Sequence, residues 1–426
     1  MKLVILFSFA SLFTLLQAQD LDTKQRTRAV RDMGKQGEEA IPRVVPYLAD
    51  TDIGVRVETV KALIEIGGPK TLDGLVRAAA DNDPEVQIRA TDGLVNVYLP
   101  GYVKTGLSGT LSRAGASVKG KFTDTNDQVI DPFIQVRPDV IAALGKLARG
   151  AASLDARANA ARAVGVLRGR AAIPDLVEAL RSKDDKLMYE SLVAIQKIGD
   201  PAAAPRISFL LRDLQEKIQV QALETTGLLR NQEAAPQVRD ALAHARTVKV
   251  KRAALEALAM LADPADHALF LENLHDKDDQ VRAAAEEGLG RLRNPMDRAA
   301  LNMAFNDEHS MSPRLSAAFA LVLSGELKTD RYGPLQYLLN SVNQRAWRDV
   351  AVAFLIELAR EQPIRQVIYG MLGTATKDEK IQLSIVLARS GDRDSEPSLE
   401  ALSRDPDPDV AAEGIRSLRA LRARLP

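Results

Sequence analysis

The stretch Val281-Arg-Ala-Ala-Ala-Glu-Glu-Gly-Leu-Gly-Arg-Leu292 decides the fold of this chain. Its apolar and small residues stand at positions i, i+3, i+4, i+7, i+8 and i+11 counted from Val281. This is the spacing of the buried stripe on an amphipathic α-helix. The same stripe begins again at Val250 and at Val86. We therefore predict a helix at each of these places, with its apolar stripe packed against neighbouring helices.

The first position of the stripe recurs along the whole chain, mostly in steps of 31 to 33 residues. It can be followed through residues 22, 55, 86, 156, 187, 218, 250, 281, 312, 347, 379 and 410. A shorter second stripe follows most of the first ones, as in Leu72, Leu75, Val76 and Ala79. A period of this length is typical of arrays of helix pairs, in which each repeat buries its apolar face on its neighbours.

The composition agrees with a stack of small aliphatic helices. The chain has 426 residues, of which 46% are hydrophobic and only 4% aromatic. Such a length exceeds what one core serves, but a repeat array has no such limit, because each unit packs only on its neighbours. Basic and acidic residues balance at 57 each, so there is no general attraction to nucleic acid or to an anionic membrane. The absence of Cys excludes thiol catalysis, zinc–thiolate sites and disulfides.

The N-terminus has the pattern of a secretory signal peptide. Met1-Lys2 gives a short positive start, residues 3–16 form an apolar run, and Gln17-Ala18 precedes a polar segment. We predict cleavage after Ala18 and export to the periplasm or beyond, as a monomer free in solution. The alternative is an uncleaved anchor helix, for which the apolar run is short. No later segment has the long uncharged run of a membrane span.

One insertion interrupts the repeats. The step from residue 86 to residue 156 is 70 residues, and residues 99–136 hold the excess. The predicted organisation is therefore a signal peptide (1–18), repeats over 19–98, an irregular and partly β-like insertion over 99–136, and repeats with a C-terminal cap over 137–426. The strand-like pieces are 118–122 and 133–136. Since the helical stripe resumes after it, the insertion is predicted to lie in the turn within the third repeat.

The insertion also carries a small basic patch. Between residues 101 and 121 there is no Asp or Glu, and two aromatic residues flank four basic ones. The candidate partner-binding residues are Tyr102, Lys104, Arg113, Lys119, Lys121 and Phe122. This patch could meet an acidic peptide or a glycan, or it could be a solvated loop with no partner, and the sequence leaves both readings open.

Charged residues recur at the repeat boundaries. Asp stands before many first helices, where it can cap the helix and favour its dipole. Arg stands at or near the second stripe position, at Arg56, Arg157, Arg252, Arg282 and Arg348. We expect an Asp-to-Arg ladder between adjacent repeats. Trp347 occupies a first stripe position and is predicted to belong to the core, and Ala257 and Gly288 are predicted to lie where helices approach closely.

These patterns resemble HEAT repeats, particularly the short bacterial type related to phycobilisome-lyase subunits. The resemblance is carried by Asp83-Pro84-x-Val86 with Ala90, by Val281-Arg282-x-x-Ala285 with Leu289, and by Val55-Arg56 running to Ala62-Leu63-x-x-Ile66-Gly67. It covers nearly all of the chain after residue 18 except 99–136. It implies an all-α, right-handed α-solenoid of about eleven helix pairs and a terminal capping helix. It says little about function, because the architecture serves many unrelated tasks.

No catalytic, cofactor-binding or metal-binding residues are predicted. None of the four His is followed by Glu, as the iron sites of hydroxylases built from similar repeats require. The segment 124–131 is acidic, but Gln135 stands where an EF-hand needs Glu and the central Gly is missing, so a solvated turn is favoured over calcium binding. No nucleophile elbow, phosphate loop or dinucleotide fingerprint occurs.

Two functions remain open at this point. The first is a non-enzymatic scaffold that binds a protein partner through its groove, through the insertion, or through both. The second is a lyase- or chaperone-like protein that holds a small molecule of the tetrapyrrole type in the groove. The lack of Cys and the scarcity of His and aromatic residues favour the first.

Overall fold

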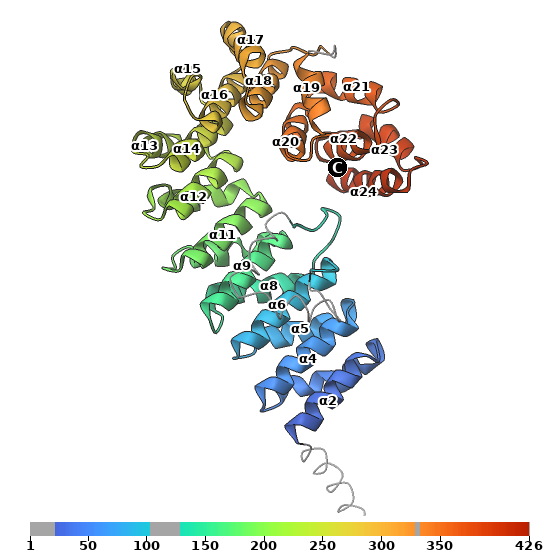
Figure 1. Cartoon of the computed structure of the whole chain (residues 1–426). Helices are drawn as coiled ribbons and strands as arrows, with labels where there is room; N and C mark the ends of the chain where they lie inside the picture. The colour runs from blue at the N-terminus through green and yellow to red at the C-terminus, as the bar shows by residue number, and fades with distance from the viewer. Residues whose placement is uncertain (1–21, 103–127, 329–332, 426) are drawn as a thin grey trace, which may run out of the picture. The chain divides into compact units, whose positions relative to one another are not determined.

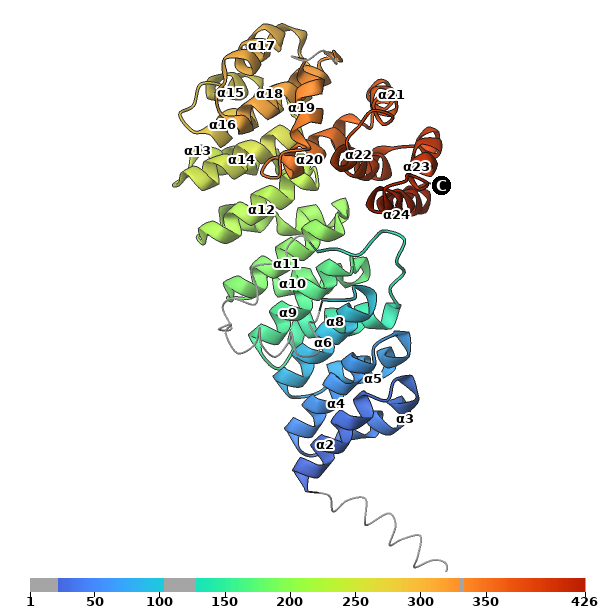
Figure 2. The same cartoon turned by 45° about the vertical axis from the view of Figure 1, so that its right-hand side comes forward.

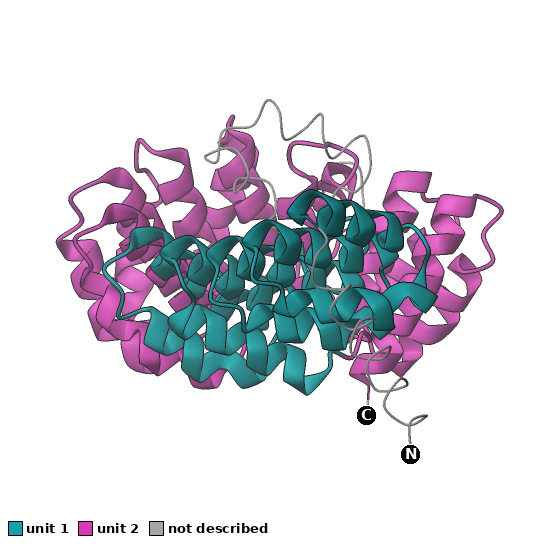
Figure 3. Ribbon diagram, turned by 90° about the horizontal axis from the view of Figure 1, so that it is seen from below, with its two compact units in different colours: residues 1–130, 136–198 teal, residues 131–135, 199–426 magenta. Residues whose placement is uncertain are grey.

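The computed structural model describes residues 22–102, 128–328 and 333–425, and every regular element among them is an α- or 3-10 helix. The all-α prediction is confirmed for these residues. The structure divides into two compact units, unit 1 with residues 1–130 and 136–198, and unit 2 with 131–135 and 199–426 (Figure 3). Each unit is described by itself.

Unit 1 is a stack of long helices with shorter helices beside them (Figures 1 and 2). In chain order its elements are α2 (Thr23–Gly34), η1 (Glu38–Ala40), α3 (Ile41–Val44), η2 (Val45–Ala49), α4 (Ile53–Ile66), η3 (Pro69–Thr71), α5 (Leu72–Ala79), α6 (Pro84–Tyr98), α8 (Pro138–Gly150), α9 (Leu154–Val166), η5 (Arg170–Ala172), α10 (Ile173–Ala179) and α11 (Asp185–Ile198). The long helices α2, α4, α6, α9 and α11 each pack on the next, and α5, α8 and α10 form a second layer.

Unit 2 repeats this arrangement. Its elements are η6 (Pro201–Arg212), α12 (Glu216–Leu228), η7 (Gln232–Ala234), α13 (Ala235–Ala243), α14 (Val248–Leu261), η8 (Pro264–Asp266), α15 (His267–Asn273), α16 (Asp279–Leu292), η9 (Pro295–Asp297), α17 (Arg298–Asp307), α18 (Met311–Leu323), α19 (Pro334–Ser341), α20 (Arg348–Leu358), α21 (Gln362–Met371), α22 (Lys377–Ser390), η10 (Arg393–Ser395), α23 (Glu396–Leu402) and α24 (Pro408–Arg424). The long helices α12, α14, α16, α18, α20, α22 and α24 pack in succession.

The long helices begin and end where the sequence signals stand. The Asp52 carboxylate accepts a hydrogen bond from the Val55 N–H at 3.1 Å, and Asp83 caps α6 through Val86 in the same way. Such caps satisfy N–H groups that have no partner inside the helix. Gly67 ends α4 with a φ of +68°, a conformation that glycine adopts without steric cost.

Glycine and alanine mark the contacts between successive long helices. A Cβ on Gly165 would lie 2.7 Å from the Ala194 Cα, and one on Gly227 would lie 2.8 Å from the Ala257 Cα. The predicted close approach at Ala257 is therefore confirmed. A Cβ on Gly288 would lie 2.5 Å from the Phe270 ring, so Gly288 also lies at a close approach, with α15. Small residues at these points let the helix backbones come together.

Two local predictions were wrong. Trp347 is half-buried and lies before α20 as its N-cap residue, whereas Ala351, Leu355 and Leu358 form the fully buried positions of that helix. The stripe of this repeat starts later than its spacing suggested. Residues 133–136 form no strand, since Phe133 lies in a turn and the three residues after it have no regular structure. The other strand-like piece, 118–122, lies outside the described residues.

In the ranges described, no helix has the length and apolarity needed to cross a bilayer.

Candidate functional site

The insertion enters and leaves along the long helices of unit 1. Of the six candidate residues, only Tyr102 is described, and the others (Lys104, Arg113, Lys119, Lys121 and Phe122) lie outside the described residues. Burial raises the pKa of Tyr102, and the charge of Asp92 adds to this effect, so its hydroxyl stays protonated. At the other end, the Ile130 N–H donates to the Val166 carbonyl of α9 at 3.0 Å. Both ends of the insertion are thus anchored on helices α6 and α9.

A buried polar network lies beside Tyr102. Arg162 of α9 donates to Glu190 of α11 through Nε at 3.0 Å and also through Nη2, and both side chains are at most 5% exposed. Burial lowers the pKa of Arg162, but the hydrogen bond and charge of Glu190 outweigh it, so the pKa is raised overall. Asn159 donates to Asp92 at 2.9 Å, and burial raises the pKa of Asp92 to about 6. This network joins three successive repeats.

In unit 2, three successive long helices carry a carboxylate at the same position of the repeat. Glu224, Glu256 and Glu287 each follow the first stripe residue of α12, α14 and α16 by six positions. All three are half-buried. Burial raises the pKa of Glu256 to about 8, with further increases from the charges of Glu287 and Glu224. The long-helix layer of unit 2 therefore presents a row of acidic groups that repeat packing itself does not require.

An arginine ties this row to a later repeat. Arg291 of α16 donates to Glu287 at 2.8 Å and to Glu357 of α20 at 3.0 Å, and its guanidinium lies 4.8 Å from the Phe319 ring centre. Phe319 stacks on Phe354 with ring centres 4.5 Å apart. Ion pairing and cation–π contact together fix the positions of α16, α18 and α20.

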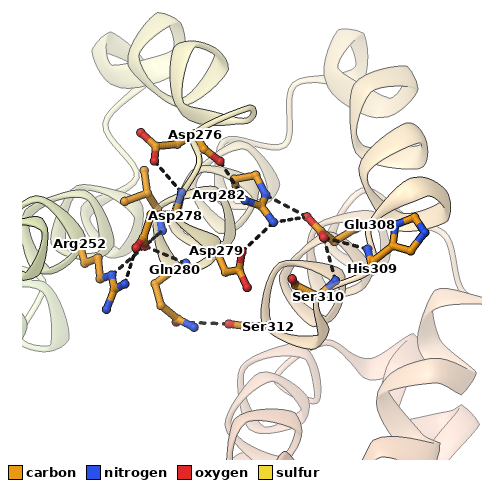
Figure 4. A network of polar contacts seen from close by, with 11 residues as sticks. Arg252, Asp276, Asp278, Asp279, Gln280, Arg282, Glu308, His309, Ser310 and Ser312 are labelled. Atoms are coloured by element: carbon orange, nitrogen blue, oxygen red, sulfur yellow. Dashed lines mark hydrogen bonds and ion pairs between the residues drawn. The ribbon is translucent and has the colours of Figure 1, made fainter.

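The predicted charge ladder is present at the edge of the stack. Arg282 of α16 donates to Glu308 at 2.9 Å, and Arg252 of α14 pairs with the N-cap residue Asp278 (Figure 4). In unit 1, Arg56 pairs with Asp81 through two hydrogen bonds of 2.8 and 3.0 Å. Each pair links a long helix to the turn that precedes the next one, so the ladder fixes the spacing of repeats.

Glu286 is a buried carboxyl whose charge has no partner. It is 1% exposed, and its Oε2 has no hydrogen-bond partner within the described structure. Burial raises its pKa to about 9, and the nearby charge of Glu308 raises it further. The group is therefore neutral at pH 7 in the folded protein.

This burial predicts a loss of stability at alkaline pH. The folded-state pKa lies above the unfolded value near 4.5, so the folded state holds the proton more tightly, and stability falls as pH rises through this window. Glu286→Gln should leave the unfolding free energy at pH 5 nearly unchanged and reduce its decline between pH 5 and pH 8 by a few kcal/mol, as measured by denaturant unfolding. Glu233→Gln, at an exposed site, is the control and should follow the wild type. Identical pH profiles for wild type and Glu286→Gln would contradict this account.

No group of three or more His, Asp or Glu side chains able to hold a metal ion occurs in the described ranges. His267 hydrogen-bonds Asp297 through Nε2 at 2.9 Å, at the start of α15. Of the acidic segment 124–131, residues 124–127 lie outside the described part. Sequence reasoning did not find the Asp92–Arg162–Glu190 network, although Glu190 is a charged residue at the i+3 position of the apolar stripe that begins at Leu187. That break in the pattern was the available signal.

Solved structures match the chain at low sequence identity. One is the complex of CpcE and CpcF of phycocyanin lyase from Nostoc sp. PCC7120, at 18% identity and a TM-score of 0.37, covering 66% of this chain and 94% of that chain. Another is importin beta, at 14% identity and a TM-score of 0.39, covering 97% of this chain and 59% of that chain. An engineered protein matches at 17% identity and a TM-score of 0.34, covering 90% and 98%.

No curated protein matches the chain. The family model for HEAT repeats matches residues 10–95, 141–213 and 203–290, which together make up more than half of the 426 residues. The predicted resemblance is confirmed, and the chain belongs to the HEAT-repeat family.

Proposed function

We propose that this protein is a non-enzymatic scaffold that binds another protein through its long-helix layer and through the insertion. The observation that carries the proposal is the row of Glu224, Glu256 and Glu287. Glu224 and Glu256 form no ion pair within the described structure, and burial raises the pKa of both. Half-buried carboxylates without partners are costly for a fold, so the place of Glu224 and Glu256 on two successive helices, beside the paired Glu287, supports a role in binding.

The insertion is the second part of the proposal. The segment from residue 103 to 121 carries positive charge without acidic residues, whereas the long-helix row of unit 2 is acidic. Loops of this length within compact folds are usually functional or disordered. The proposal extends the sequence-based expectation of an exported, monomeric protein with a right-handed winding of its helix pairs. Edman sequencing of the purified protein tests the cleavage after Ala18.

Removing the insertion tests where the partner binds. Residues 103–127 are replaced by a Gly/Ser linker of about ten residues, and the anchors Tyr102 and Ile130 are kept. The solenoid should stay folded, because loop closure costs vary only with the logarithm of length. Affinity capture from the native host should lose its partner. The helical circular-dichroism signal is the control for folding.

A charge variant separates the two surfaces. Changing Lys104, Arg113, Lys119 and Lys121 to Ser should weaken capture mainly at low salt, where charge is least screened. Glu224→Gln with Glu256→Gln should weaken it independently. Equal capture by the linker variant, the Ser variant and the Gln variant would contradict the proposed scaffold surfaces. A chromophore that co-purifies with the protein would instead favour a tetrapyrrole-binding role.

A further inference from the structure

The turns before α4, α6, α16, α18 and α24 each contain an acidic residue with two roles. Its side chain accepts a hydrogen bond from the backbone N–H two residues later, and it pairs with a cation on the preceding long helix. The pairs are Asp50 with Arg26, Asp81 with Arg56, Asp276 with Lys251, Glu308 with Arg282, and Asp405 with Lys380. Figure 4 shows both roles for Glu308, which pairs with Arg282 and accepts from the Ser310 N–H, and it shows Asp276 accepting from the Asp278 N–H. In these five repeats, the acid at this turn position is thus the partner of the cation on the preceding long helix.

In the repeat of α9 the acid is missing. Ser182 occupies the turn position, because its Oγ accepts from the Asp184 N–H at 3.1 Å. Arg157 precedes Ser182 by 25 residues, the same separation as between Arg56 and Asp81. Ser182 has no charge to offer. Arg157 donates through Nε to the Ala148 carbonyl at 3.1 Å, and no carboxylate within the described ranges pairs with it.

Arg157 and Ser182 line one cleft. The cleft has a volume of about 540 Å³ and lies among α8, α9 and α10 of unit 1. Its remaining lining residues are Arg149, Pro174, Asp175, Glu178 and Arg181. Nη1 of Arg149 lies 3.4 Å from Oδ1 of Asp175, and Nη1 of Arg181 lies 3.4 Å from Oε2 of Glu178. These two acids each have a guanidinium of their own, so Arg157 supplies the one uncompensated positive charge of the cleft.

We propose that this cleft binds a carboxylate, which takes the place of the missing acid opposite Arg157. A guanidinium presents parallel N–H groups that match the two oxygens of a carboxylate. The Arg56–Asp81 pair shows this geometry at the equivalent place in the same protein, with distances of 2.8 and 3.0 Å. The volume falls within the range of small-ligand sites, about 300–1,000 Å³.

The carboxylate has two possible sources that share this chemistry. It is either a free dicarboxylate or the side chain of a Glu or Asp on another polypeptide. The uncompensated charge of Arg157 attracts either one. The inference goes beyond the proposed scaffold function and does not rest on it, because it concerns the helix pairs of unit 1 and not the acidic row or the insertion.

The test uses the Nε–Hε signal of Arg157 in the full chain labelled with ¹⁵N-arginine. The signal is assigned by its loss in Arg157→Gln. The probes are glutarate, the peptide acetyl-Gly-Glu-Gly-amide and inorganic phosphate, each at the same ionic strength. Glutarate or the peptide should shift the Arg157 signal in a saturable manner below about 20 mM. A response to glutarate alone identifies a free dicarboxylate, and a response to the peptide identifies a polypeptide side chain.

Three variants of the turn decide between charge and shape. Ser182→Asp restores the acid of the other repeats and should abolish the response, because the new carboxylate occupies Arg157. Ser182→Asn has nearly the same shape without the charge and should keep the response. Lys183→Gln makes the same change in net charge as Ser182→Asp at an exposed neighbour outside the cleft, and it should also keep the response.

The remaining outcomes overturn the proposal. They are the absence of a saturable shift with both carboxylate probes, an unchanged response in Ser182→Asp, and loss of the response in Ser182→Asn or Lys183→Gln. Tighter binding of phosphate than of either carboxylate shows that the ligand class is wrong. Far-UV circular dichroism confirms that each variant is folded, so each result bears on the cleft itself.

Discussion

Replacing Arg162 by Met should cost about 3–5 kcal/mol of unfolding free energy, because the substitution leaves Glu190 buried without its counter-charge. Both side chains of the pair are at most 5% exposed, so water cannot take over the role of the guanidinium. The hydrogen bonds of the pair link α9 to α11, and the loss should be felt in both helices. Denaturant unfolding followed by far-UV circular dichroism measures the effect.

Two further variants show whether burial is the cause. Arg162→Met combined with Glu190→Met should recover most of the lost stability, since apolar residues of similar volume replace a buried ion pair at little cost. Arg28→Met removes the exposed Arg28–Asp32 pair and should change stability by less than about 0.5 kcal/mol. If Arg162→Met is as mild as Arg28→Met, the pair is not held in the low-dielectric environment that the structure shows.

Gly290→Ala is the second large effect. A Cβ at residue 290 would lie 2.5 Å from the Cα and 2.6 Å from the Cβ of Ala320 on α18. Backbone atoms cannot rotate away as a flexible side chain can, so α16 and α18 must separate. We expect a loss of about 2–3 kcal/mol, although Ala is the better helix former. Thermal unfolding of the wild type and the variant measures it.

Gly370→Ala is the matched control within unit 2. Gly370 lies inside α21, and a Cβ there would meet no atom within 4 Å. The same substitution should therefore stabilise the protein by about 0.5–1 kcal/mol. Opposite signs at residues 290 and 370 would establish steric contact as the cause. Stabilisation at both positions would mean that α16 and α18 are farther apart than described.

The repeat period could be predicted from the sequence because it depends on few residue types. Val281 and the small residues after it specify a helix face, and Asp83 and Asp52 specify where helices start. Trp347 was misplaced because spacing alone cannot show where a helix begins when no capping residue precedes it. The ladder was predictable in kind, since Arg and Asp recur with the period. The absence of an acid at Ser182 could not be predicted from the period, because it becomes apparent only when the equivalent turns of the folded repeats are compared.

The network around Arg162 shows the limit of this reasoning. Its residues come from three helices, and their contact depends on how far each helix is rotated about its axis. Periodicity fixes that rotation only to within a residue or so, while an ion pair requires atoms within 4 Å. The acidic row of Glu224, Glu256 and Glu287 was open to prediction in principle, because its members share one position of the repeat. Its members are nevertheless not distinguishable in the sequence from solvated charges on a helix surface, because their burial depends on the packing of neighbouring helices.

The separation of Arg291 and Glu357 in the sequence has a consequence for the order of folding. Ladder partners such as Arg56 and Asp81 are 25 residues apart, so each can form as soon as two repeats exist, with only a short loop to close. Arg291 and Glu357 are 66 residues apart, and their helices are separated in the chain by α17, α18 and α19. This contact can form only when the intervening repeats are in place. During synthesis on the ribosome, the Arg291–Glu357 contact can therefore form only after α20 has emerged, whereas the ladder contacts of earlier repeats can form before it.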